Sequence, residues 1–119
     1  MRFISTRFHA KLDYLTGVFL IATPRLFGFT ESTEAAWVCM IAGGLALTYS
    51  IFTDYQGGVI RSIPMRVHLI LDVMSGIVLA ASPWLFGFAD EVYLPHLIIG
   101  IFEIAAGMLT SSEAYAHQS

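Results

Sequence analysis

Four stretches of the chain are almost continuously apolar, and short polar segments separate them. They cover about residues 12–29, 35–52, 67–88 and 94–109. Stretches of about 17–25 apolar residues can cross a bilayer as helices. Inside lipid a single span has to satisfy its own backbone hydrogen bonds, which a helix does. The pattern therefore predicts an all-α membrane protein with four transmembrane helices.

The composition favours the same fold class. The chain has 119 residues, of which 56% are hydrophobic and only 13% are charged, and its mean hydropathy is +0.71. Soluble domains usually carry about 25% charged residues. We therefore expect a single membrane domain, residues 1–119, with the lipid bilayer as its partner. The net charge of −3 speaks against nucleic acid as a partner, since nucleic-acid binding needs a basic surface.

Basic residues are concentrated on one side of the predicted bundle. Five of the six precede the first span or lie between the second and third, and only Arg25 lies on the other side. Cytoplasmic loops of membrane proteins are enriched in Lys and Arg. We therefore expect a multi-pass protein with both termini in the cytoplasm.

The chain contains an internal repeat. Residues 9–29 and 68–88 align without a gap, 59 residues apart, and eleven of the 21 positions are identical. Repeat one covers about residues 9–52, repeat two covers about 68–111, and a linker of about 53–66 joins them. Each repeat holds two spans, so both repeats have the same orientation. We expect two tandem helical hairpins as parallel repeats, related by a pseudo-two-fold axis along the membrane normal.

The first span of each repeat ends in a proline motif. Residues 23–29 read TPRLFGF and residues 82–88 read SPWLFGF. These segments, with the histidine and aspartate upstream of each, resemble the SPW repeat family of small bacterial membrane proteins. The resemblance implies a repeat fold in the bacterial cytoplasmic (inner) membrane, and it implies no activity. Repeat one departs from the Ser-Pro-Trp motif, because Thr23 and Arg25 replace the serine and the tryptophan.

We interpret this motif as a helix end with an interfacial anchor. Serine or threonine before proline can bond a backbone carbonyl, glycine permits the turn, and aromatic residues favour the interface. A ligand or partner site at the outer rim is the alternative. The outer-rim motif comprises Thr23, Pro24, Gly28, Ser82, Pro83, Trp84 and Gly87, and the predicted aromatic collar comprises Phe27, Phe29, Trp37, Trp84, Phe86, Phe88 and Tyr93.

A histidine and an aspartate four residues apart begin the first span of each repeat, as His9 with Asp13 and His68 with Asp72. This spacing places both side chains on one face of a helix. The favoured interpretation is a hydrogen bond that holds the start of each helix. If the two pairs met near the bundle axis, they would form a set able to bind a divalent metal or to pass protons.

Glu103 lies inside the fourth span. A carboxylate near the bilayer centre costs at least about 2.5–3.5 kcal/mol, so we expect Glu103 to face the bundle. Its position within the fourth span predicts that Glu103 lies at the same depth in the membrane as Asp13 and Asp72. We interpret it as a buried acid that joins helices, with Tyr49 or Thr48 as its hydrogen-bond partner. A proton or cation site is the alternative.

The sequence carries no P-loop, no Rossmann glycine run and no nucleophile elbow, and Cys39 is its single cysteine. We therefore expect no enzyme, and we assign no catalytic, cofactor-binding or metal-binding residue and no cofactor. The expected role is a structural or accessory bundle that forms a homo-oligomer or joins a larger membrane complex. The alternative is a proton- or cation-coupled transporter or conducting element. Its candidate polar site comprises His9, Asp13, Tyr49, His68, Asp72 and Glu103.

Overall fold

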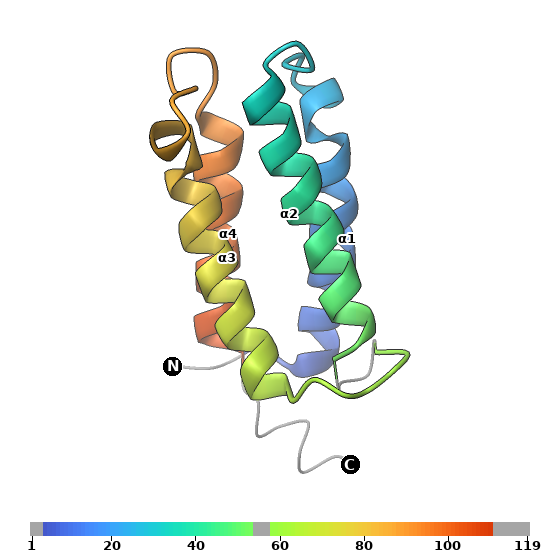
Figure 1. The fold of residues 1–119 in the computed structure, drawn as a ribbon. Coiled ribbons are helices and arrows are strands. Elements are labelled where there is room, and N and C mark those ends of the chain that lie inside the picture. Colours follow the sequence, from blue (N-terminus) through green and yellow to red (C-terminus); the bar gives the residue numbers. More distant parts are fainter. Residues whose placement is uncertain (1–3, 54–57, 111–119) are drawn as a thin grey trace.

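Four helices make up most of the chain. The computed structural model describes residues 4–53 and 58–110, and the helices are α1 (Thr6–Leu26), α2 (Thr33–Ile51), α3 (Met65–Leu85) and α4 (Leu94–Leu109). Within these residues there is no strand, only two isolated bridges. α1 and α3 run in one direction and α2 and α4 in the other (Figure 1). The all-α prediction is confirmed.

The bundle has two ends, which we name by their connections. At the linker end lie the starts of α1 and α3, together with the connection from α2 to α3 (Figure 1). At the hairpin-turn end lie the two tight connections from α1 to α2 and from α3 to α4 (Figure 1). The common direction of α1 and α3 is the one that parallel repeats require. The two-fold rotation itself stays a prediction.

The same turn ends α1 and α3. Gly28 (φ 73°) and Gly87 (φ 75°) adopt the left-handed region, which glycine enters without the steric cost of a Cβ. In the first hairpin the amide of Phe29 donates to the Pro24 carbonyl at 2.9 Å, and the second hairpin repeats this bond at 2.8 Å. This pattern is that of a Schellman helix end. The predicted first and third spans end at Phe29 and Phe88. The helices end three residues earlier, at Leu26 and Leu85.

Glycines bring the two helices of each hairpin into close contact. A Cβ added to Gly43 of α2 would lie 2.5 Å from the backbone oxygen of Gly17 in α1. A Cβ added to Gly100 of α4 would lie 2.6 Å from the backbone oxygen of Gly76 in α3. In lipid, helices associate largely through such close packing of small residues. Both hairpins therefore use the same kind of crossing.

The two hairpins share a buried centre toward the hairpin-turn end. Leu20 and Leu79, at equivalent repeat positions, are 0% and 1% exposed. Phe29 and Phe88 are also buried, and their rings lie 5.5 Å and 4.8 Å from the His96 ring. Their place in the predicted interfacial collar is wrong, because each Schellman turn directs its last residue back onto the bundle. The exposed members of the collar are Phe27, Trp37, Trp84, Phe86 and Tyr93.

Two of the four helices, α2 and α3, have both the length and the hydropathy of a membrane span. α4 is apolar but has only 16 residues, which extend about 24 Å. α1 carries four charged residues among its 21. The four predicted helices are therefore present, and a span is supported by length and hydropathy for two of them. Residue 111 of the predicted second repeat and residues 54–57 of the predicted linker lie outside the described residues.

Candidate functional site: a buried histidine and aspartate cluster

The two histidine and aspartate pairs meet at the linker end of the bundle. α1 contributes His9 and Asp13, and α3 contributes His68 and Asp72. Both histidine side chains are 0% exposed, and the aspartate side chains are 11% and 5% exposed. The spacing of four puts each pair on the helix face that turns toward the other hairpin. We call these four residues the His–Asp cluster.

Each histidine of the cluster contacts both aspartates through Nε2. His9 Nε2 lies 2.6 Å from Asp72 Oδ2 and 3.1 Å from Asp13 Oδ1. His68 Nε2 lies 2.8 Å from Asp13 Oδ2 and 3.2 Å from Asp72 Oδ2. The shorter contact crosses to the other hairpin in both cases. The favoured prediction, a hydrogen bond within one helix, therefore describes only the longer contact of each histidine.

A threonine fixes the other ring nitrogen of each histidine. His9 Nδ1 lies 2.6 Å from Thr110 Oγ1, and this hydroxyl also donates to the Ala106 carbonyl at 2.6 Å. Thr53 Oγ1 lies 2.6 Å from His68 Nδ1 and donates to the carbonyl one turn earlier at 2.6 Å. A hydroxyl has a single proton, so a threonine that donates to a carbonyl accepts from the ring. Both Nδ1 atoms therefore carry hydrogen, and both Nε2 atoms face the carboxylates.

The two threonines are exchanged between the hairpins. Thr110 follows α4 of the second hairpin and contacts α1 of the first, whereas Thr53 follows α2 of the first and contacts α3 of the second. A bridge to Ile4 holds Thr110, and a bridge to Ile63 holds Thr53. Neither threonine was among the predicted site residues. A repeated position in the sequence could have identified them: they lie 57 residues apart, and each follows the second helix of its hairpin within two residues.

Two residues from the second helices adjoin the cluster. The Tyr49 hydroxyl of α2 donates to Asp72 Oδ1 at 2.5 Å, and its ring centroid lies 4.9 Å from that of His68. Glu103 of α4 is 7% exposed, and its carboxylate interacts electrostatically with Asp72 and Asp13. Glu103 Oε1 is buried and has no hydrogen-bond partner among the described residues. The structure thus brings all six residues of the predicted polar site into one region.

The partners predicted for Glu103 bond elsewhere. The Tyr49 hydroxyl donates to Asp72. Thr48 is exposed and donates to the Gly44 carbonyl of its own helix at 2.7 Å. The expectation that either residue bonds to Glu103 is therefore wrong, because the single hydroxyl proton of Tyr49 goes to Asp72 and because Thr48 lies on the outer face of α2.

The proline motif lies at the opposite, hairpin-turn end. Ser82 Oγ donates to the Leu79 carbonyl at 2.7 Å, and this carbonyl is the one that the following proline leaves without an amide partner. Thr23 Oγ1 donates to the Phe19 carbonyl at 2.6 Å, one position earlier than the freed carbonyl. These bonds stay within their own helices. In both repeats the motif thus shapes the end of a helix.

A second contact between the hairpins lies at this end. His96 Nε2 of α4 lies 2.9 Å from the Ala35 carbonyl and 3.3 Å from Cys39 Sγ, both in α2. His96 is 0% exposed. His96 was not a predicted site residue, since its partners are 57 and 61 residues away in the chain and share no helical spacing with it.

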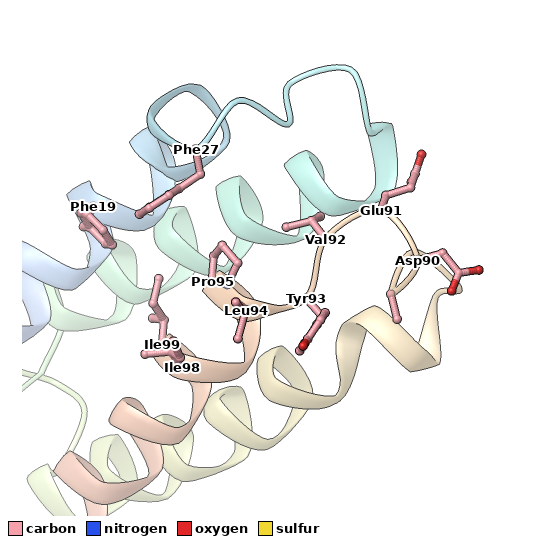
Figure 2. A pocket seen from close by; sticks show the side chains of 11 residues that line it. Phe19, Phe27, Asp90, Glu91, Val92, Tyr93, Leu94, Pro95, Ile98 and Ile99 are labelled. Atoms are coloured by element: carbon pink, nitrogen blue, oxygen red, sulfur yellow. The ribbon is translucent and has the colours of Figure 1, made fainter.

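An open groove of about 650 Å³ runs between α1 and α4 at the hairpin-turn end (Figure 2). Phe19 of α1 and Phe27, which directly follows α1, lie across it from Pro95 of α4 (Figure 2). The charged residues on its rim, Asp90 and Glu91, point away from it (Figure 2). Ligand sites combine apolar walls with convergent polar groups. Because this groove offers only the former, we place the candidate site at the His–Asp cluster.

Comparison with known proteins bears on the whole bundle. Neither a curated protein nor a solved structure matches the chain. A family model described as the SPW repeat domain matches residues 7–110. That range contains all four cluster residues, Tyr49, Glu103 and both proline motifs. The chain therefore belongs to the SPW repeat family.

Proposed function

We propose that this SPW repeat protein is a multi-pass protein of the bacterial cytoplasmic membrane in which all four helices lie in the bilayer. Large apolar side chains are exposed on every helix, and exposure of this extent is stable in lipid rather than in water. Among them are Leu15 and Val18 of α1, Ile41 and Leu45 of α2, Ile70 and Met74 of α3, and Ile98 and Ile101 of α4.

The charges of α1 are compatible with this placement. Arg7 and Lys11 lie near its start and Arg25 near its end, where long side chains can reach the headgroups. Asp13 joins the His–Asp cluster instead of facing lipid. The distribution of basic residues favours the linker end on the cytoplasmic side. Both termini of the chain then lie in the cytoplasm.

The role of the protein in this proposal is structural or accessory: it is a small bundle that associates with itself or with a larger membrane complex. The observation that carries the proposal is the closed polar network of the cluster. Both ring nitrogens of each histidine bond within the bundle, to carboxylates and to a threonine of the other hairpin. Such a network joins the hairpins, and we propose no enzymatic activity for it.

Two experiments test the topology and the role. Reporter fusions after Ser119 and within the first hairpin turn should report a cytoplasmic and an external location, respectively. Purification in mild detergent should yield a homo-oligomer or a complex with another membrane protein. Asp72→Asn removes a charge from the network between the hairpins and should lower the yield of this assembly. An external reporter signal after Ser119 contradicts the topology, and an isolated monomer in mild detergent contradicts the accessory role.

A second candidate function rests on Glu103. A buried carboxylate with an unbonded oxygen, beside two aspartates, is the arrangement that proton and cation pathways in membranes use. In this alternative the bundle conducts protons or couples a cation to transport. Glu103→Gln keeps the side-chain shape and removes the titrating proton. Loss of a pH-gradient-driven flux in liposomes with a stably folded Glu103→Gln protein would favour the pathway over the accessory bundle.

A further inference from the structure

The His–Asp cluster has the donor set of a transition-metal site. Two imidazole nitrogens and two carboxylates, with ligand atoms all within 4.8 Å of one another, converge on one buried point. The four histidine-to-aspartate contacts measure 2.6 to 3.2 Å. A tetrahedral zinc site with bonds of about 2.0–2.1 Å holds its ligand atoms about 3.4 Å apart. The histidine-to-aspartate contacts are thus shorter than the ligand separations of a filled site, so the four side chains would move apart only slightly to admit an ion.

The orientation of the two imidazoles is the second observation. In each ring, Nδ1 donates to a threonine hydroxyl that is itself committed to a carbonyl, so the nitrogen available to a cation is Nε2. Histidines that bind metals almost always donate their other ring N–H to an oxygen in this way, which fixes the ring and its tautomer. The threonine bonds therefore hold both rings in the orientation and tautomer that a metal site needs.

The carboxylates are supported and balanced as well. The Tyr49 hydroxyl donates to Asp72 Oδ1, which leaves Oδ2 directed at the histidines. Two carboxylates neutralise one divalent cation, so the filled site carries no net charge inside the bundle. Ligation by imidazole nitrogen favours first-row transition metals and disfavours Mg²⁺ and Ca²⁺, which prefer oxygen ligands.

From this geometry we propose that His9, Asp13, His68 and Asp72 bind one divalent transition-metal ion, of the chemical class of Zn²⁺, between the two hairpins. All four tetrahedral positions are filled by protein side chains, and closed sites of this kind are structural rather than catalytic. The ion thereby fastens α1 to α3 at the linker end. This inference does not depend on the accessory role, since its failure leaves the topology and the assembly of the protein as they were.

The test uses the full chain in detergent after removal of metal with a chelator. Titration calorimetry with zinc chloride should show one Zn²⁺ per chain, and cobalt(II) chloride should give the intense visible bands of tetrahedral Co²⁺. Excess Mg²⁺ should displace neither ion. His68→Gln and Asp13→Asn each remove one ligand and should lower Zn²⁺ affinity by more than about 100-fold, the upper range seen for indirect supports of metal sites.

Two matched controls locate the site. His96→Gln alters a buried histidine outside the cluster and should leave Zn²⁺ binding unchanged, as should His117→Ala. Thr53→Val and Thr110→Val keep all four ligands and remove only the support of Nδ1. Each should weaken binding by about 10–100-fold, with the helical circular dichroism unchanged, and so tests the site even where a ligand variant does not fold.

Three results would overturn the proposal. The first is a folded wild-type chain that binds no Zn²⁺ or Co²⁺. The second is unchanged affinity in a folded His68→Gln or Asp13→Asn protein, or in both threonine variants. The third is loss of binding in His117→Ala, which would assign the ion to a site other than the His–Asp cluster.

Discussion

In the first hairpin, α1 gives one histidine and one aspartate to the cluster, and in the second hairpin α3 gives the same two residues 59 positions later. Each hairpin also crosses at a pair of glycines, ends its first helix at a glycine with positive φ, and gives a threonine to the histidine of the other. All of these shared features lie at helix ends or helix contacts. The glycines shape each hairpin, and the histidine, aspartate and threonine contacts join it to the other hairpin.

The second helices differ where they adjoin the cluster. When Gly43 is matched to Gly100, which makes the equivalent crossing, Ala46 of α2 corresponds to Glu103 of α4. The same register pairs Tyr49 with Ala106. One hairpin therefore brings a phenol to the site and the other a carboxylate. The comparison separates a repeated framework, which holds the bundle together, from the positions that make the two sides of the cluster chemically different.

The largest effect is expected where the framework itself is broken. Asp72→Ala and Asp13→Ala each leave two buried histidines short of a carboxylate, and breaking one partner of a buried pair costs about 3–5 kcal/mol. Asp72 should lie at the upper end, because it also accepts the Tyr49 hydroxyl and its side chain is 5% rather than 11% exposed. The free energy of unfolding, measured by denaturing-detergent titration in mixed micelles, checks this order.

An acid from the hairpin turn provides the control for these two variants. Asp90 is exposed, so Asp90→Ala should leave the free energy of unfolding unchanged. If Asp72→Ala cost less than about 1 kcal/mol, a typical net hydrogen bond, the cluster would not be what holds the hairpins together.

The next largest loss of stability is expected from substitutions at the glycine crossings, and it should be similar in the two hairpins. A Cβ at Gly43 would lie 2.5 Å from the Gly17 oxygen, and one at Gly100 would lie 2.5 Å from the Ala80 nitrogen. Because backbone atoms cannot move aside, Gly43→Ala and Gly100→Ala should each cost about 1–3 kcal/mol of overpacking. Thermal unfolding in detergent measures the loss.

Gly44 is the matched control, since a Cβ there meets nothing within 4 Å. Gly44→Ala should be neutral or stabilise the helix by up to about 1 kcal/mol. A stable Gly100→Ala protein beside an unstable Gly43→Ala protein would show that the two crossings are not equivalent.

The framework could be predicted from the sequence because its signals are local and occur twice. The four apolar stretches predicted the helices, and the gapless alignment of the two repeats predicted the common direction of α1 and α3. The spacing of four in His9 and Asp13 predicted that both side chains share one helix face. The proline motif was readable as a helix end for the same reason. The end of each helix was predicted three residues too late, because the residues around the turn glycine in LFGF are apolar and continue the hydrophobic pattern of the span.

The contacts between hairpins could not be predicted in the same way. Thr53 and Thr110 reach their histidines only after the chain has folded, across 15 and 101 residues. His96 bonds to Ala35 across 61 residues, and no helical periodicity connects them. Glu103 was identified as buried by its cost in lipid, but its surroundings depend on how α4 meets the other hairpin, which hydropathy does not specify.

Glu103 breaks the repeat, and its replacement should have a smaller effect than the framework variants. Because Glu103 Oε1 is buried and has no hydrogen-bond partner among the described residues, Glu103→Leu removes a polar atom that bonds to none of them, and replacing buried charged groups by apolar residues is often neutral or stabilising. We expect both Glu103→Leu and Glu103→Gln to change the free energy of unfolding by less than about 1 kcal/mol. A cost for Glu103→Leu as large as that for Asp72→Ala would mean that Glu103 belongs to the framework.

Tyr49 is the other residue that breaks the repeat, and its hydroxyl should contribute least. Tyr49→Phe removes one donor to Asp72 Oδ1 and keeps the ring against His68. Hydrogen bonds between helices in membranes average about 0.6 kcal/mol, so unfolding should become easier by about that amount. In the Asp72→Asn background the same change should cost less, because the acceptor has lost its charge, and this non-additivity is what a double-mutant cycle would measure. Strict additivity would mean that the hydroxyl acts independently of Asp72, and the asymmetry between α2 and α4 would then lie in the packing of the ring rather than in the polar network.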